Sequence, residues 1–102
     1  MHSYERIMSN FRIFMHRNED VLHIKLMGDF DGFSAFQLIH ALENVCSGIR
    51  RVMIHTDSLN DISSSALGVF KQHFLQLKVS AFRISFTGKN SNRIMPLGAL
   101  TA

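Results

Sequence analysis

The chain has 102 residues, of which 46% are hydrophobic and 19% charged, a balance that predicts one globular domain rather than a disordered chain. Its formal charge of +3 is mild and its basic residues are scattered, which argues against nucleic-acid binding. No apolar run is long enough to span a membrane, and the N-terminus lacks the apolar core of a signal peptide. The single cysteine cannot form an internal disulfide. We therefore expect a cytoplasmic protein with no membrane insertion.

The first third of the chain predicts a β-hairpin. We expect residues 1–10 to form a flexible lead before a single domain that spans residues 11–100. The segments "FRIFMHR" (11–17) and "VLHIKLMG" (21–28) alternate between apolar and polar residues, and "NED" (18–20) separates them. Two period-two runs joined by a short polar turn are typical of an antiparallel hairpin.

The middle of the chain predicts two helices with a strand between them. Residues 31–48 have a helical period that ends at Gly48, "RRVMIHT" (50–56) has the character of a strand, and a second helix is expected from Ser64 to about Leu77. The apolar stripe of the first helix comprises Ala35, Leu38, Ile39, Leu42, Val45 and Cys46, and that of the second comprises Leu67, Phe70, Phe74 and Leu77.

The last third predicts a strand at "SAFRISF" (80–86) and one or two helical turns within "NSNRIMPLG" (90–98). The resulting order is β-β-α-β-α-β-α, an α/β domain with a mixed four-stranded sheet. Strands that alternate with helices run parallel through right-handed crossovers. If the strands lie in sequential order, both long helices cover the same face of the sheet.

The other face of the sheet is expected to be open. A sheet buried on both sides has continuously apolar strands, and these strands are interrupted by charged and histidine residues. The face is either simply solvated or a surface for a partner or a second copy. Its expected residues are Arg12, His16, His23, Lys25, His55 and Arg83, mixed with Phe14, Met27 and Met53.

Three segments together resemble the STAS domains of sulfate transporters and anti-sigma factor antagonists. "GDFDGFSAFQL" (28–38) resembles the Gly-x-x-Asp signature between a strand and a helix. "VMIHTDSLNDISSSALGVF" (52–70) resembles the second signature, in which an Asp-rich loop leads to Asp-Ser-Ser-Gly-Leu-Gly at a helix start. "FTGKNSNRIMPLGAL" (86–100) resembles the following strand and helix. The resemblance covers residues 11–100.

This resemblance implies a bacterial signalling protein that regulates transcription by binding a partner. Stand-alone members of the family bind an anti-sigma factor that is also a serine kinase, and phosphorylation of the first serine of Asp-Ser-Ser-Gly ends that binding. Aligning Leu67-Gly68 with the family's Leu-Gly assigns that serine to Ser64. Two positions depart from the family: Ser63 replaces the aspartate and Ala66 replaces the glycine. The first departure puts kinase recognition in doubt and makes Ser63 and Ser65 fallback phosphorylation sites.

The binding end is expected at the start of the second helix, together with the loop of residues 28–33. Asp29, Asp31, Asp57 and Asp61 are expected to lie near it, because both loops follow neighbouring strands. A phosphate there is tolerated because a helix start offers free amides and partial positive charge. The simpler interpretation is that Ser63 or Ser64 is only an N-cap. The expected partner-binding residues are Asp29, Asp31, Gly32, Phe33, Asp61, Ser63, Ser64, Ser65, Leu67 and Lys71.

The sequence gives no reason to expect an enzyme, a cofactor or a metal. Asp29 and Asp31 have no accompanying nucleophile or base, and Asp31 is better placed as a cap of the first helix. The six histidines lack the spacing of a metal site, although His23 and His55 could be neighbours across strands.

A second interpretation stays open. The departures at Ser63 and Ala66 also suit a constitutive STAS adaptor or structural subunit, for example of a transport complex, that works without phosphorylation. The family commonly adds a strand and a helix after the position of Ala102. A domain that is short at its C-terminus would expose an edge of the sheet and favour association, including a homodimer.

Overall fold

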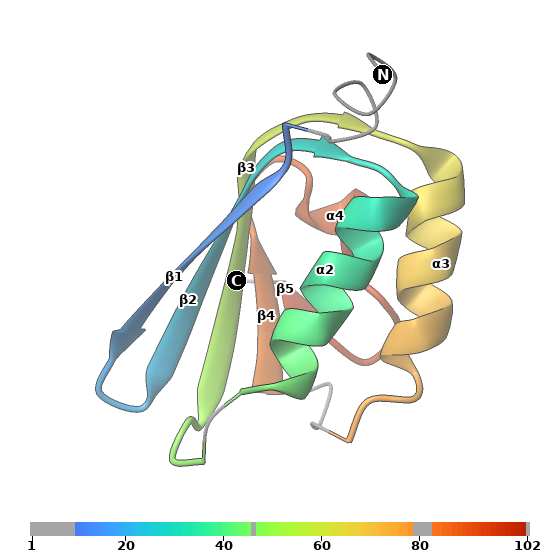
Figure 1. Ribbon diagram of the computed structural model, residues 1–102. Helices are drawn as coiled ribbons and strands as arrows, with labels where there is room; N and C mark the ends of the chain where they lie inside the picture. Colours follow the sequence, from blue (N-terminus) through green and yellow to red (C-terminus); the bar gives the residue numbers. More distant parts are fainter. Residues whose placement is uncertain (1–9, 46, 79–82, 102) are drawn as a thin grey trace, which may run out of the picture.

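The computed structural model describes residues 10–45, 47–78 and 83–101 (Figure 1). The expected flexible lead, apart from its last residue, and the first part of the expected strand at 80–86 lie outside the described residues. The elements are β1 (Arg12–Asn18), β2 (Val21–Phe30), α2 (Gly32–Glu43), β3 (Arg51–Ile62), α3 (Ser64–Phe74), β4 (Ile84–Thr87), α4 (Ser91–Ile94) and β5 (Leu100–Thr101).

The strands form one sheet in the order β1-β2-β3-β4-β5. β1 is antiparallel to β2, and the remaining neighbours are parallel. Both long helices, α2 and α3, lie side by side on the same face of the sheet (Figure 1). The predicted mixed α/β sheet and element order are confirmed, and the two-residue β5 at the edge is an addition that the sequence did not predict.

The predicted hairpin is present as β1 and β2. Asn18 pairs with Val21, so that only Glu19 and Asp20 form the turn. Glu19 has a φ of 58°, the left-handed conformation that two-residue hairpin turns require. The turn is held to the rest of the domain because the carbonyl of Asp20 accepts the backbone amide of Arg50 at 2.7 Å.

β3 is longer than the sequence indicated. Residues 57–62 were expected to be an Asp-rich loop, but β3 continues to Ile62 and pairs with the whole second half of β2. Irregular register between Lys25 and Met27, and again between Gly28 and Phe30, lets the two long strands stay paired. The strand therefore depends on its neighbour rather than on local propensity, which is low for Asp and Asn.

The core fills the space between the sheet and the two long helices. Phe70 of α3 is completely buried at its centre. Its ring lies 5.9 Å from that of Phe30 and 6.2 Å from that of Phe86, both edge to face, and 5.6 Å from that of Phe74. The described residues of both predicted apolar stripes contribute to this core, with Leu67 and Leu77 partly buried at its margin, whereas Cys46 lies outside the described residues.

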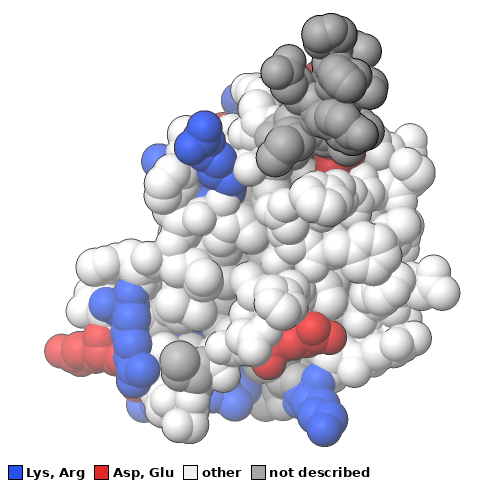
Figure 2. All heavy atoms as spheres, viewed as in Figure 1, with Lys and Arg blue, Asp and Glu red and all other residues white. Residues whose placement is uncertain are grey.

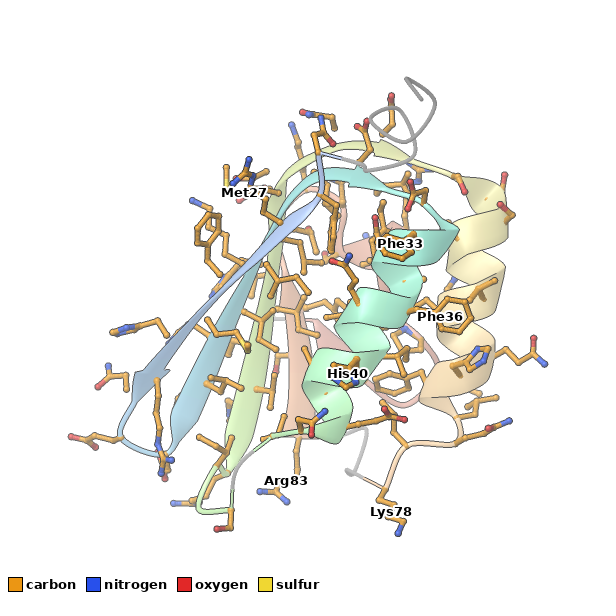
Figure 3. All side chains as sticks on the ribbon, viewed as in Figure 1. Met27, Phe33, Phe36, His40, Lys78 and Arg83 are labelled. Atoms are coloured by element: carbon orange, nitrogen blue, oxygen red, sulfur yellow. The ribbon has the colours of Figure 1, made fainter. Side chains whose placement is uncertain are left out.

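The opposite sheet face carries a row of histidines. The Nδ1 atom of His23 and the Nε2 atom of His55 share a hydrogen bond of 2.9 Å, and the two rings are stacked. His55 Nδ1 is hydrogen bonded to the Thr87 hydroxyl at 2.7 Å, and the His16 ring lies 6.4 Å from that of His23. Arg83 was expected on this face, but its guanidinium instead donates to the backbone carbonyls of Ile49 and Arg50 (Figure 3).

His55 should make the domain less stable in mild acid. Burial lowers the pKa of His55, and the charges of His23 and Lys25 lower it further, while Asp57 opposes them. The unfolded chain therefore takes up a proton at His55 below about pH 6.5 more readily than the folded chain does. Stability should fall as the pH falls below 6.5, as measured by urea unfolding at several pH values. His55→Gln should flatten this dependence, whereas His40→Gln on exposed α2 should not; equal slopes for both would contradict the assignment.

Candidate functional site

The start of α3 is capped by the first serine of the run. The Ser63 hydroxyl accepts the backbone amide of Ala66 at 3.0 Å and lies 3.1 Å from the Ser65 hydroxyl. The Ser63 amide donates to the carbonyl of Phe30 at 3.0 Å, which joins this corner to the end of β2. Ser63 therefore stabilises the helix start, as the N-cap interpretation proposed for one of the two serines.

Ser64 and Ser65 are exposed on the first turn of α3. No hydrogen bond joins the Ser64 hydroxyl to the described part of the chain. Ala66 behind them is completely buried, so the position that holds glycine in the family motif has room here for a single methyl group. Of the three serines, Ser64 has the hydroxyl that is both exposed and unused.

Removing the cap should destabilise the protein, whereas removing its neighbour should not. Ser63→Ala loses the acceptor for the Ala66 amide, and we expect a loss of about 1 kcal/mol in the free energy of unfolding. Ser64→Ala should change it by less than about 0.5 kcal/mol. Urea unfolding of both variants measures this. A Ser64→Ala variant as unstable as Ser63→Ala would mean that the capping roles are wrongly assigned.

The first signature builds the neighbouring corner. Asp31 caps α2, as expected: its Oδ1 atom accepts both the amide and the hydroxyl of Ser34 at 2.9 Å. The Asp29 Oδ1 atom accepts the amide of Asp61 at 3.3 Å, which brings the ends of β2 and β3 together. Gly28 has a φ of +94°, and a Cβ there would lie 2.5 Å from the Asn10 carbonyl oxygen, so this position requires glycine.

Asp57 does not belong to this corner. It was expected to lie near Asp29, Asp31 and Asp61, but it precedes Asp61 by four residues on an extended strand, about 13 Å. Its carboxylate accepts the amide of Lys89 at 2.8 Å, in the loop that follows β4. Asp57 thus supports the loop before α4.

Arg93 is a residue of this end that sequence reasoning missed. It lies in α4, and its Nη2 atom donates to the carbonyl of Ile62 at 3.2 Å, immediately before Ser63. The signal in the sequence was the single arginine within the short helical segment 90–98. It brings a positive charge close to the serine run.

The remaining predicted binding residues fall into two groups. Gly32 begins α2, and Phe33 beside it is 61% exposed, so it projects from the helix start (Figure 3). Leu67 and Lys71 are only partly exposed on α3, and Leu67 packs against the core. Phe33 and the serine run are therefore the more accessible parts of this end.

The described residues contain no group of three or more His, Cys, Asp or Glu side chains that could hold a metal ion. Within the same ranges, no helix is both long and apolar enough to span a membrane.

Comparison with known proteins identifies the fold. No family model and no curated protein matches the sequence. The anti-sigma factor antagonist SpoIIAA in its unphosphorylated form matches 90% of this chain and 86% of its own, with a TM-score of 0.60 and 14% identity. An anti-sigma factor antagonist from Mycobacterium paratuberculosis matches 82% of this chain and 73% of its own, with a TM-score of 0.62 and 14% identity.

A third match is to part of a larger protein. The structure named Mglu matches 72% of this chain with a TM-score of 0.60 and 20% identity, but this chain covers 18% of its length. At these identities the likeness establishes the fold, and the fold is that of SpoIIAA. The STAS-like fold that the sequence resemblance implied is thus confirmed.

Proposed function

We propose that this STAS-like domain is an anti-sigma factor antagonist that binds an anti-sigma factor with serine-kinase activity. The binding end consists of the first turn of α3, the Asp29–Asp61 corner and the exposed Phe33. Phosphorylation of Ser64 ends the binding. The observation that carries this proposal is the exposed hydroxyl of Ser64 on a helix start that Ser63 already caps.

A phosphate on Ser64 suits the helix that carries it. The first turn of a helix has amides without intrahelical partners and a partial positive charge, so added negative charge is favourable there. The same group adds a charge of about −1.5 to −2 three residues after Asp61, which is hydrogen bonded to Asp29. A partner that packs closely on this corner must then desolvate and face that charge, so the complex weakens while the domain stays folded.

The two departures from the family motif are compatible with this role. Serine and aspartate are both effective N-caps, and Ser63 performs the capping that an aspartate would perform at its position. Ala66 fits in the core behind the serine run. Ser63 remains a fallback phosphorylation site, but its hydroxyl is engaged with the Ala66 amide. Ser65 is exposed and is the stronger fallback.

Two experiments test the proposal in sequence. Co-purification of the tagged chain from its native host should recover a kinase-like ATPase, and incubation with that kinase and ATP should add one phosphate. Peptide mass spectrometry should place the phosphate on Ser64, and Ser64→Ala should remain unmodified while Ser65→Ala is modified normally. Recovery of a transporter ATPase with no modification would favour the constitutive adaptor instead.

A further inference from the structure

An apolar groove lies between β1 and α2, on the helix-covered side of the sheet. It has a volume of about 660 Å³, within the range of small-molecule sites. Met15 is 58% exposed and Phe36 50% exposed, so large apolar side chains line the groove without being covered. Figure 2 shows a broad uncharged surface over α2, with the charged side chains at its margins.

The groove is apolar at one end, and at the other end Arg17 lies among apolar side chains such as Leu22 and Ile49. β1 and α2 both run opposite to β2, so their first residues lie at one end and their last residues at the other (Figure 1). The beginnings of the two elements contribute Ile13 and Phe33. The ends contribute Arg17 and His40, and Figure 3 shows Phe33 and His40 at the two ends of α2.

Arg17 gives its end of the groove a positive charge that is available to a ligand. Its Nε atom donates to the carbonyl of Glu19 at 2.7 Å, which fixes the side chain beside the hairpin turn. The ion pair found in the described ranges is that between Arg50 and Asp20, so no carboxylate there neutralises Arg17. The remaining guanidinium N–H groups are suited to a carboxylate, which they can bind in a bidentate manner.

We propose that this groove binds a fatty acid, with the alkyl chain along Ile13, Met15 and Phe33 and the carboxylate on Arg17. A single alkyl chain needs no polar partners and matches a groove whose apolar lining extends over its whole length and whose one arginine lies at one end. A peptide could pair its main chain with the free edge of β1, so peptide binding in place of a fatty acid is the alternative outcome of the test. The groove shares Phe33 with the proposed binding end but contains no residue of the serine run, and its test does not depend on the proposed function.

An NMR titration of the full chain with decanoate and with 1-decanol tests this site. Decanoate should give saturable shifts confined to β1 and α2 and should bind more tightly than decanol. Arg17→Met should weaken decanoate about fivefold to tenfold and leave decanol within about twofold, because only the carboxylate contacts the guanidinium. Arg17→Lys should retain most of the preference for decanoate.

The matched control is Arg12→Met, which removes an arginine from the opposite face of the same strand and should leave both affinities unchanged. The proposal is overturned if decanoate causes no saturable shifts in the groove, if decanol binds as tightly as decanoate, or if Arg17→Met weakens both equally. Binding of a peptide or protein there without decanoate would also overturn it. None of these results involves Ser64, so they are independent of the phosphorylation experiment.

Discussion

Replacing Phe70 with alanine should lower the free energy of unfolding by about 3–5 kcal/mol. The side chain is fully buried and contacts the rings of Phe30, Phe74 and Phe86, which come from the sheet and from α3. Its removal loses the transfer free energy of the ring and leaves a cavity that these neighbours cannot fill. Urea unfolding measures the loss. The loss is a large fraction of the total free energy of unfolding, which is about 5–15 kcal/mol for a typical domain.

The matched control for this prediction is Phe33→Ala, which removes the same side chain from a position that is 61% exposed. We expect it to change the free energy of unfolding by less than about 1 kcal/mol. If the two variants lose similar stability, Phe70 is not the centre of the core and the packing of α3 on the sheet is wrong.

Ser64→Asp should weaken binding to the anti-sigma partner by about a hundredfold, or roughly 3 kcal/mol. The new carboxylate lies three residues after Asp61, within the proposed binding end, and must be desolvated in the complex. The free domain should be as stable as the original or slightly more so, because an acidic residue in the first turn of a helix is favourable. Isothermal titration calorimetry and thermal unfolding give the two quantities.

Ser64→Asn is the matched control for charge, because asparagine has nearly the same shape as aspartate. It should retain most of the affinity. If Ser64→Asn weakens the complex as much as Ser64→Asp does, the effect is one of size, and the electrostatic explanation fails.

The parts of the fold that sequence could predict are those set by local pattern. The alternating residues of β1 and β2 and the polar turn at Glu19 gave the hairpin, and the apolar stripe through Phe70 gave α3 and its buried face. The capping residue Asp31 was also predicted, and the cap of α3 was narrowed to Ser63 or Ser64, because a helix start needs a side-chain acceptor at that position.

The features that were missed depend on contacts between distant segments. The second half of β3 contains Asp57, Asn60 and Asp61, which disfavour strands, and it is extended only because β2 pairs with it. Arg93 is brought to the serine run by the packing of α4. The apolar groove lies between β1 and α2. The pattern of each segment does not show how closely the two pack, so the sequence did not predict the groove.

The most direct test of the account compares the chain carrying phosphoserine at position 64 with the unmodified chain in two measurements made side by side. We expect the phosphorylated chain to unfold within a few degrees of the unmodified one and to bind its anti-sigma partner at least about a hundredfold more weakly. Equal affinity of the two forms, or a phosphorylated chain that has lost its cooperative unfolding, would contradict it.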